Sequence, residues 1–84
     1  MSENIKTIEN AFRIIDLLHE EGSLGVSDIA KKLGLPKTSS HRTLKTLQNL
    51  DIVRQDKQEI YSLGYRMYKY ARALDTDELL IDLA

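Results

Sequence analysis

The sequence predicts a mainly α-helical domain that carries one small β-hairpin. Three observations support this fold class. Apolar residues recur at helical spacing in the first half of the chain. A Gly-Leu-Pro turn joins two of the helical segments without a gap. After Leu50 the pattern changes to two short β-prone runs, and a further helical segment follows. With 84 residues, the chain has room for one small domain.

The first helix is expected over about residues 7–21. Thr7 can cap it, because a hydroxyl accepts a hydrogen bond from an exposed N–H group of the first turn. Gly22 is expected to end it. The apolar positions cover more than one narrow stripe and are Ile8, Ala11, Phe12, Ile14, Ile15, Leu17 and Leu18. Part of this surface is therefore left for a partner.

The second helix is expected to begin at Ser27, a favourable N-cap, with Asp28 at the positive end of the helix. Gly34 stops this helix, and Pro36 fits the first position of the next one, where its missing N–H is not needed. Two helices joined by such a short turn with a glycine form a helix-turn-helix, the motif that places its second helix in the major groove of DNA.

The third helix is expected over about residues 36–50, with Ser40, Leu44, Leu47 and Leu50 on its inner side. At about 100° per residue, the opposite side holds Thr38, Arg42, Lys45 and Asn49, flanked by Ser39 and Thr46. Arg42 is the expected base reader, since its fork matches guanine O6 and N7. Lys37, Ser39 and Thr46 are expected to hold phosphates. For His41 two interpretations stay open, a contact with phosphate or simple exposure to solvent. A second alternative concerns the whole basic face of this helix, which can also be a solvated surface without a ligand.

Residues 52–55 and 60–63 are the two β-prone runs, separated by the polar segment 56–59. We expect a hairpin with Val53, Tyr61 and Leu63 turned toward the core. A hairpin directly after the recognition helix is the wing of a winged helix, and Lys57 at its tip could reach an adjacent backbone or the minor groove. The sequence thus predicts a winged helix-turn-helix over residues 1–64.

A linker or dimerisation helix is expected from Gly64, with Met67, Tyr70, Ala71 and Leu74 at helical spacing. Residues 75–78 resemble a fresh helix start, and an apolar segment, 79–83, follows. We expect residues 65–84 to form this helix and the start of a missing C-terminal region, or else a dimer contact.

Charge is distributed unevenly along the chain, although the net charge is only -1. Residues 31–58 carry seven Lys and Arg against two acidic residues, a net charge of +5. Residues 1–30 and 75–84 each carry a net charge of -4. Nucleic-acid binding depends on the local potential. A basic middle between acidic ends predicts one cationic face.

Several function classes are disfavoured by composition. The chain has no cysteine, so disulfides and thiolate metal sites are excluded. No apolar run reaches the roughly 18 residues that span a bilayer, and the polar start is not a secretory signal, so we expect a cytoplasmic protein without membrane contact. The sequence holds no phosphate-binding glycine loop and no zinc-protease pattern around His19, which is expected to complement the negative end of the first helix. We therefore expect no enzyme and no cofactor.

The segments just described resemble a known family when taken together. Residues 11–18 (AFRIIDLL), 27–30 (SDIA), 34–42 (GLPKTSSHR) and 61–64 (YSLG) are similar to the N-terminal domain of IclR-type bacterial transcription regulators. The similarity covers roughly residues 6–74. It departs from the family at Ser40, where an apolar residue is usual, and at the wing tip, which lacks the usual glycine.

The resemblance implies a winged helix-turn-helix regulator that binds a near-palindromic operator as a dimer; a repressor is the expected type, and activation stays open. In such proteins the first helix and the helix after the wing pair the domains, which implies dimer contacts by Phe12, Ile15, Met67, Tyr70 and Leu74. Members of the family also carry a C-terminal effector-sensing domain, which we do not expect within these 84 residues, so no effector ligand is expected on this chain. The predicted DNA contacts are Ser27, Lys37, Thr38, Ser39, His41, Arg42, Lys45, Thr46 and Lys57. The alternative function is a winged-helix interaction or dimerisation module that does not read DNA.

Overall fold

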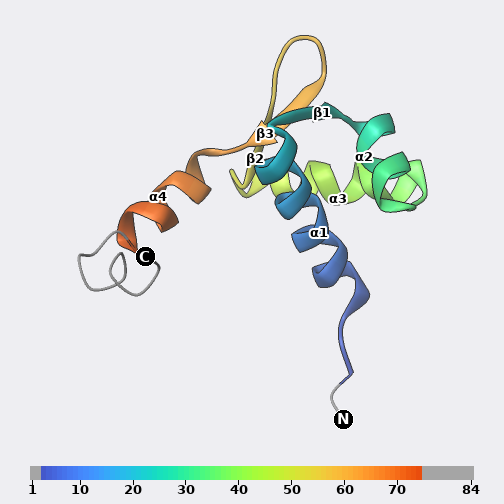
Figure 1. Ribbon diagram of the computed structural model, residues 1–84, viewed down its shortest axis with the longest axis horizontal. Helices are drawn as coiled ribbons and strands as arrows, with labels where there is room; N and C mark the ends of the chain where they lie inside the picture. The colour runs from blue at the N-terminus through green and yellow to red at the C-terminus, as the bar shows by residue number, and fades with distance from the viewer. Residues whose placement is uncertain (1–2, 75–84) are drawn as a thin grey trace.

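The computed structural model describes residues 3–74, and the helix start expected at residues 75–83 lies outside them. Three helices pack with a small sheet, and a fourth helix leads away from it (Figure 1). The elements in chain order are α1 (Lys6–Glu21), β1 (Ser23–Gly25), α2 (Val26–Leu33), α3 (Lys37–Asn49), β2 (Val53–Gln55), β3 (Ile60–Leu63) and α4 (Tyr65–Ala73). This is the predicted winged helix-turn-helix.

The core lies where α1, α2, α3 and the sheet meet. Its buried members come from all four and are Ile14, Leu17, Leu18, Ile29, Leu44, Leu47, Val53 and Tyr61. The inner side of α3 is the predicted one, because Ser40, Leu44 and Leu47 are buried. Leu50 is an exception, with 42% of its surface exposed. Burial of one side of α3 leaves the other side turned to solvent.

The sheet has three antiparallel strands in the order β1-β3-β2, one more than the predicted hairpin. The added strand, β1, pairs Leu24 with Tyr61 and Gly25 with Ile60. A three-residue strand is too short to show a period of two, so only its pairing with β3 identifies it. Val53 and Tyr61 are buried as predicted, and Leu63 packs half-buried against the core.

Three predicted helix starts are wrong by one or two residues. Helix α1 begins at Lys6 after an extended Ile5, so Thr7 lies inside the first turn and does not cap it. Helix α2 begins at Val26 with Gly25 as its N-cap, so Ser27 also lies inside the helix. Pro36 has an extended ψ of 140° and is the N-cap of α3. The pairing of β1 holds Gly25 extended, which fixes the start of α2 independently of side-chain capping.

The end of α3 and the start of α4 are joined through Asp51, Ile52 and Gly64. The N–H of Ile52 donates to the Leu47 carbonyl at 2.9 Å and that of Asp51 to Gln48 at 3.0 Å, which is a Schellman ending with Asp51 at a φ of 61°. The Gly64 N–H donates to the Ile52 carbonyl at 2.7 Å. A Cβ at Gly64 would lie 2.5 Å from the Asp51 carbonyl oxygen, so only glycine fits here.

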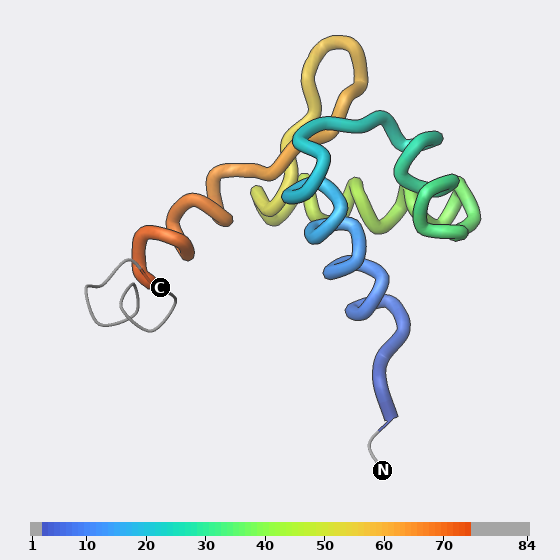
Figure 2. The backbone as a smooth tube through the Cα atoms, viewed as in Figure 1, coloured from blue at the N-terminus to red at the C-terminus, as the bar shows by residue number. Residues whose placement is uncertain are grey.

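Helix α4 projects from the body on the side away from α2 (Figure 2). None of its residues is buried. Its tyrosines are mostly open to solvent, and Tyr65 is 67% exposed. Helix α4 therefore adds no buried residue to the core of the domain.

Candidate nucleic-acid interface

The turn between α2 and α3 is fixed by backbone geometry and by one arginine of α1. Gly34 takes a left-handed φ of 67°, as predicted for the residue that ends α2. The Leu35 N–H then donates to the Ala30 carbonyl at 2.9 Å. Arg13 of α1 donates through Nη2 to the Leu33 carbonyl at 2.7 Å. These contacts set the direction in which α3 leaves α2.

Sequence reasoning did not assign a role to Arg13. Its guanidinium also donates to the Asn10 side chain at 3.4 Å, so it is held from two sides. A helical arginine that reaches a carbonyl 20 residues away leaves no local pattern in the sequence. Its contribution is to position the recognition helix.

The exposed face of α3 gathers hydrogen-bond donors at its N-terminal half. Lys37, Thr38, His41 and Arg42 line a shallow hollow of about 300 Å³. All four residues are exposed. No carboxylate occurs between Lys37 and Asn49, whereas this helix carries three Lys and Arg. The hollow is therefore cationic, and it lies at the positive end of the helix dipole.

Ser39 and Thr46 lie on a different side of α3 from this hollow. Together with Arg42 they line a groove of about 490 Å³ between α3 and α1, whose apolar lining includes Ile8 and Phe12. Their hydroxyls donate to backbone carbonyls, Ser39 to Pro36 at 3.2 Å and Thr46 to Arg42 at 3.2 Å. Arg42 lies at the border and lines both hollows.

Lys45 connects the recognition helix to the wing. Its Nζ lies 3.4 Å from Oε1 of Gln48 on α3 and 3.3 Å from Oε1 of Gln55 on β2. The side chain is exposed, so this contact leaves it accessible to a further anion. Gln55 was missed from the sequence, because its role follows only from the packing of β2 beside α3.

The wing turn over residues 56–59 closes without glycine. The Asp56 carboxylate accepts hydrogen bonds from the N–H groups of Gln58 at 2.9 Å and Ile60 at 3.0 Å. Glu59 takes the left-handed φ of 64° that a glycine would adopt easily. Lys57 is exposed in this turn, which stands out from the body (Figure 2).

The residues predicted for dimer contacts differ in exposure. Phe12 is 58% exposed, Tyr70 50% and Leu74 62%, and Met67 is half-buried. Ile15 is only 7% exposed. It is thus largely covered by its own chain and offers little surface to a partner.

A solvent-facing helix of donors, fixed by a glycine turn and flanked by a three-stranded wing, defines a winged helix-turn-helix of the DNA-binding class. Residues 7–57 match the family described as the IclR helix-turn-helix domain. The chain belongs to the IclR family of DNA-binding transcriptional regulators.

Curated relatives agree with this assignment. The chain is 40% identical over 82 residues to the glycerol operon regulatory protein of Streptomyces coelicolor, covering 94% of this chain and 32% of that protein. It is 37% identical over 65 residues to the transcriptional regulator XynR of Escherichia coli, covering 75% and 26% respectively. The chain thus spans about a quarter to a third of these relatives, which are named as regulators and not as enzymes.

Solved structures share the fold. The IclR regulator of Alicyclobacillus acidocaldarius has a TM-score of 0.82 at 34% identity, over 93% of this chain and 33% of that one. The Zα domain of Carassius auratus PKZ, solved in complex with Z-DNA, has a TM-score of 0.67 at 28% identity, over 70% and 98%. Within residues 3–74, no helix is long and apolar enough to cross a membrane. No cluster of potential metal ligands occurs in that range.

Proposed function

We propose that this domain binds a specific operator in double-stranded DNA, with the exposed face of α3 in the major groove. The hollow lined by Lys37, Thr38, His41 and Arg42 carries this proposal. It gathers donors on the N-terminal half of a solvent-facing helix, which is the part that usually reaches base edges. The major groove, about 12 Å wide, admits such a helix.

Arg42 is the proposed base reader. Its guanidinium makes no hydrogen bond or ion pair with the rest of the described chain. The guanidinium is therefore available to donate two parallel hydrogen bonds, one to guanine O6 and one to guanine N7, which a lysine cannot do. Thr38 and His41 lie beside it in the hollow and are proposed to contact the adjacent edge or backbone.

The remaining predicted contacts are proposed to position the helix on phosphates. For Ser39 and Thr46 this requires the hydroxyl hydrogen to leave its backbone carbonyl, so we expect smaller contributions from them than from the lysines. The proposed phosphate contacts are Ser27, Lys37, Ser39, Lys45, Thr46 and Lys57.

We further propose that the domain acts as a homodimer on a near-palindromic operator, because operator symmetry mirrors protein symmetry. The apolar residues Phe12 on α1 and Tyr70 and Leu74 at α4 are at least half exposed, and they supply the contact surface. The charges of the two helices are also complementary. Helix α1 carries four acidic residues against two Lys and Arg, whereas α4 carries three Lys and Arg and no acidic residue. The buried Ile15 is left out of this surface.

The test is selection of bound sequences from a pool of random duplexes at low salt. We expect one enriched motif with two half-sites in inverted orientation. Enrichment of no motif would refute sequence reading and leave the interaction module as the function. A single half-site, together with a monomer in sedimentation at high concentration, would refute the dimer alone.

Two substitutions at one position separate charge from geometry. Arg42→Ala should weaken binding by about 1–3 kcal/mol and relax one base position. Arg42→Lys keeps the charge but loses the two-bond match, so it should relax the same position with little change in salt dependence. Lys37→Ala should weaken all sequences alike and lower the salt slope by about 1 per protomer, or about 2 for the dimer. If Arg42→Lys keeps the full base preference, Arg42 does not read a base.

A further inference from the structure

Helix α4 presents two opposite faces of different chemistry. At about 100° per residue, Tyr65, Tyr68, Lys69 and Arg72 share one face. Met67, Tyr70, Ala71 and Leu74 share the other and form the apolar side that we assign to the dimer. The first set, hereafter the cationic–aromatic face, has no role in the core, because α4 contributes no buried residue.

The side chains of the cationic–aromatic face are ordered by contacts with one another. The rings of Tyr65 and Tyr68 stack with centroids 5.8 Å apart and planes 30° apart. Lys69 Nζ lies 5.9 Å from the Tyr65 ring, and the Arg72 guanidinium lies 5.9 Å from the Tyr68 ring. Arg72 Nη1 also donates to the Tyr68 hydroxyl at 3.2 Å. Both cations are thus held on one side of the helix with donors left over.

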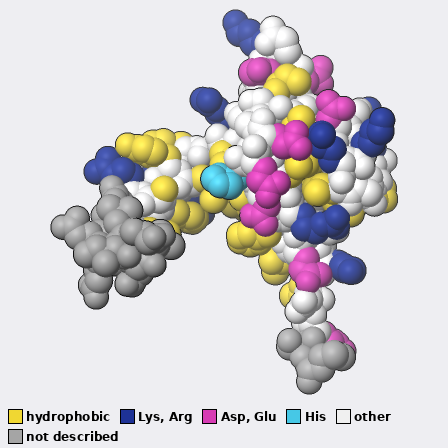
Figure 3. Space-filling model, viewed as in Figure 1, with side chains coloured by type: hydrophobic (Ala, Val, Ile, Leu, Met, Phe, Trp, Pro, Cys, Tyr) yellow, Lys and Arg dark blue, Asp and Glu magenta, His cyan; other side chains and the backbone are white. Residues whose placement is uncertain are grey.

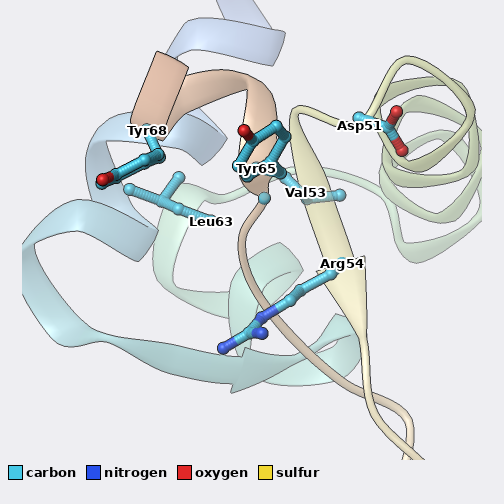
Figure 4. A pocket seen from close by; sticks show the side chains of 7 residues that line it. Asp51, Val53, Arg54, Leu63, Tyr65 and Tyr68 are labelled. Atoms are coloured by element: carbon cyan, nitrogen blue, oxygen red, sulfur yellow. The ribbon is translucent and has the colours of Figure 1, made fainter. Parts of the chain in front are cut away.

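This face continues onto the outer side of the wing. Tyr65 and Tyr68 line a pocket of about 380 Å³ together with Arg54 of β2, and Figure 4 shows the Arg54 side chain extending from β2 across the sheet, with its guanidinium away from the two rings. Arg54 Nε donates to the Ser62 hydroxyl at 3.1 Å, and its two terminal nitrogens make no hydrogen bond or ion pair within residues 3–74. Asp51 is the one carboxylate in the pocket lining.

Charge along this surface has a single sign over most of its length. Arg54, Lys69 and Arg72 provide three positive charges, and no acidic residue occurs in α4. In the space-filling view, basic and apolar side chains lie on the visible face of the described part of the arm that carries α4 (Figure 3). A polyanion that passes along the surface would meet these three cations.

We propose that Arg54 and the cationic–aromatic face of α4 form a second DNA contact, which binds the phosphate backbone beside the base pairs read by α3. This inference rests on the proposed function and adds a surface to it. Backbone contacts of this kind raise affinity without reading sequence. Because the apolar face of α4 points the opposite way, dimerisation and backbone binding can use the same helix at the same time.

The test is the salt dependence of binding to the selected operator duplex with about ten further base pairs on each side. Each phosphate contact contributes about 0.9 to the slope of log affinity against log salt. Each substitution is present in both protomers of the bound dimer, so the double variant Lys69→Gln with Arg72→Gln should lower the slope by about 1.8 per protomer, or about 3.6 in all. When salt rises from about 50 to about 200 mM, the affinity of this variant should therefore fall by a factor about 150 times smaller than that of the parent. Arg54→Gln alone should lower the slope by about 1.8 for the dimer.

A matched control removes two exposed lysines elsewhere. Lys6→Gln with Lys32→Gln, on α1 and α2, changes the net charge equally and should leave the slope unchanged, because Lys32 is already paired with Glu21 of α1 at 3.4 Å. The sequence preference and the dimer measured by sedimentation should be the same in the test and control variants. An equal slope loss in both double variants would show that only total charge matters and would overturn the inference.

Two other results would also overturn it. One is an unchanged slope in the Lys69→Gln and Arg72→Gln variant. The other is dissociation of the dimer by that variant, which would make this face a protein interface. Failure of the proposed function is distinct, because the parent domain would then enrich no sequence at all. If the parent domain enriches a motif and the double variant keeps the salt slope of the parent, only the second DNA contact is refuted.

Discussion

Ser40 provides the sharpest test of the packing under the recognition helix. It is 2% exposed, and its Oγ has no hydrogen-bond partner among the described residues. A buried hydroxyl without a partner costs about 1–3 kcal/mol. Ser40→Ala removes this penalty and gains a better helix former, while the gap left by one oxygen costs about 0.5 kcal/mol. We expect the free energy of unfolding to rise by about 1 kcal/mol or more.

Thermal unfolding followed by circular dichroism measures this effect, and a domain of this size should gain about 4–8 °C per kcal/mol. The neighbouring Ser39→Ala is the matched control. Ser39 is exposed on the same helix, so its change in stability should stay within about 0.5 kcal/mol. DNA affinity should fall for Ser39→Ala and not for Ser40→Ala. If Ser40→Ala leaves the midpoint unchanged or lowers it, the hydroxyl has a partner and the reasoning is refuted.

Three other substitutions test the backbone around the interface. Gly64→Ala places its Cβ 2.5 Å from the Asp51 carbonyl oxygen and should lower the free energy of unfolding, measured by urea titration, by about 1–3 kcal/mol. Gly25→Ala is the control, because the nearest contact of its Cβ is at 3.6 Å, and it should change stability little. Glu59→Gly relieves a φ of 64° in the wing turn and should raise the urea midpoint; a fall would show that the turn is unstrained. Arg13→Ala removes the hydrogen bond to the Leu33 carbonyl at the end of α2. The free energy of operator binding should therefore fall by more than the free energy of unfolding, and an equal loss in both would argue for a purely structural role.

Much of the fold could be predicted because its signals are local. The apolar period of α1 and α3, the left-handed Gly34 and the change of period after Leu50 each lie within a few residues. Helix starts were less secure. Ser27 looks like an N-cap by residue type, but Gly25 takes that position because β1 already holds it extended.

The sequence predicted which residues form the candidate site better than it predicted how their side chains are arranged. The donors of α3 are recognisable from helical spacing, and the structure gathers Lys37, Thr38, His41 and Arg42 in one hollow. The sequence could not show that Ser39 and Thr46 turn toward α1, since this depends on how two helices pack. Whether each side chain touches DNA stays a prediction.

The sequence by itself determined the family, the order of helices and strands, and the cationic character of α3, because each depends on residue type and short-range spacing. Only the tertiary structure decided which exposed residues act together. The approach of Arg13 to Leu33 and of Lys45 to Gln55, and the pocket that Arg54 shares with the tyrosines of α4, join residues from separate elements. Such contacts arise from packing, since no local pattern records which distant side chain a helix or strand will meet.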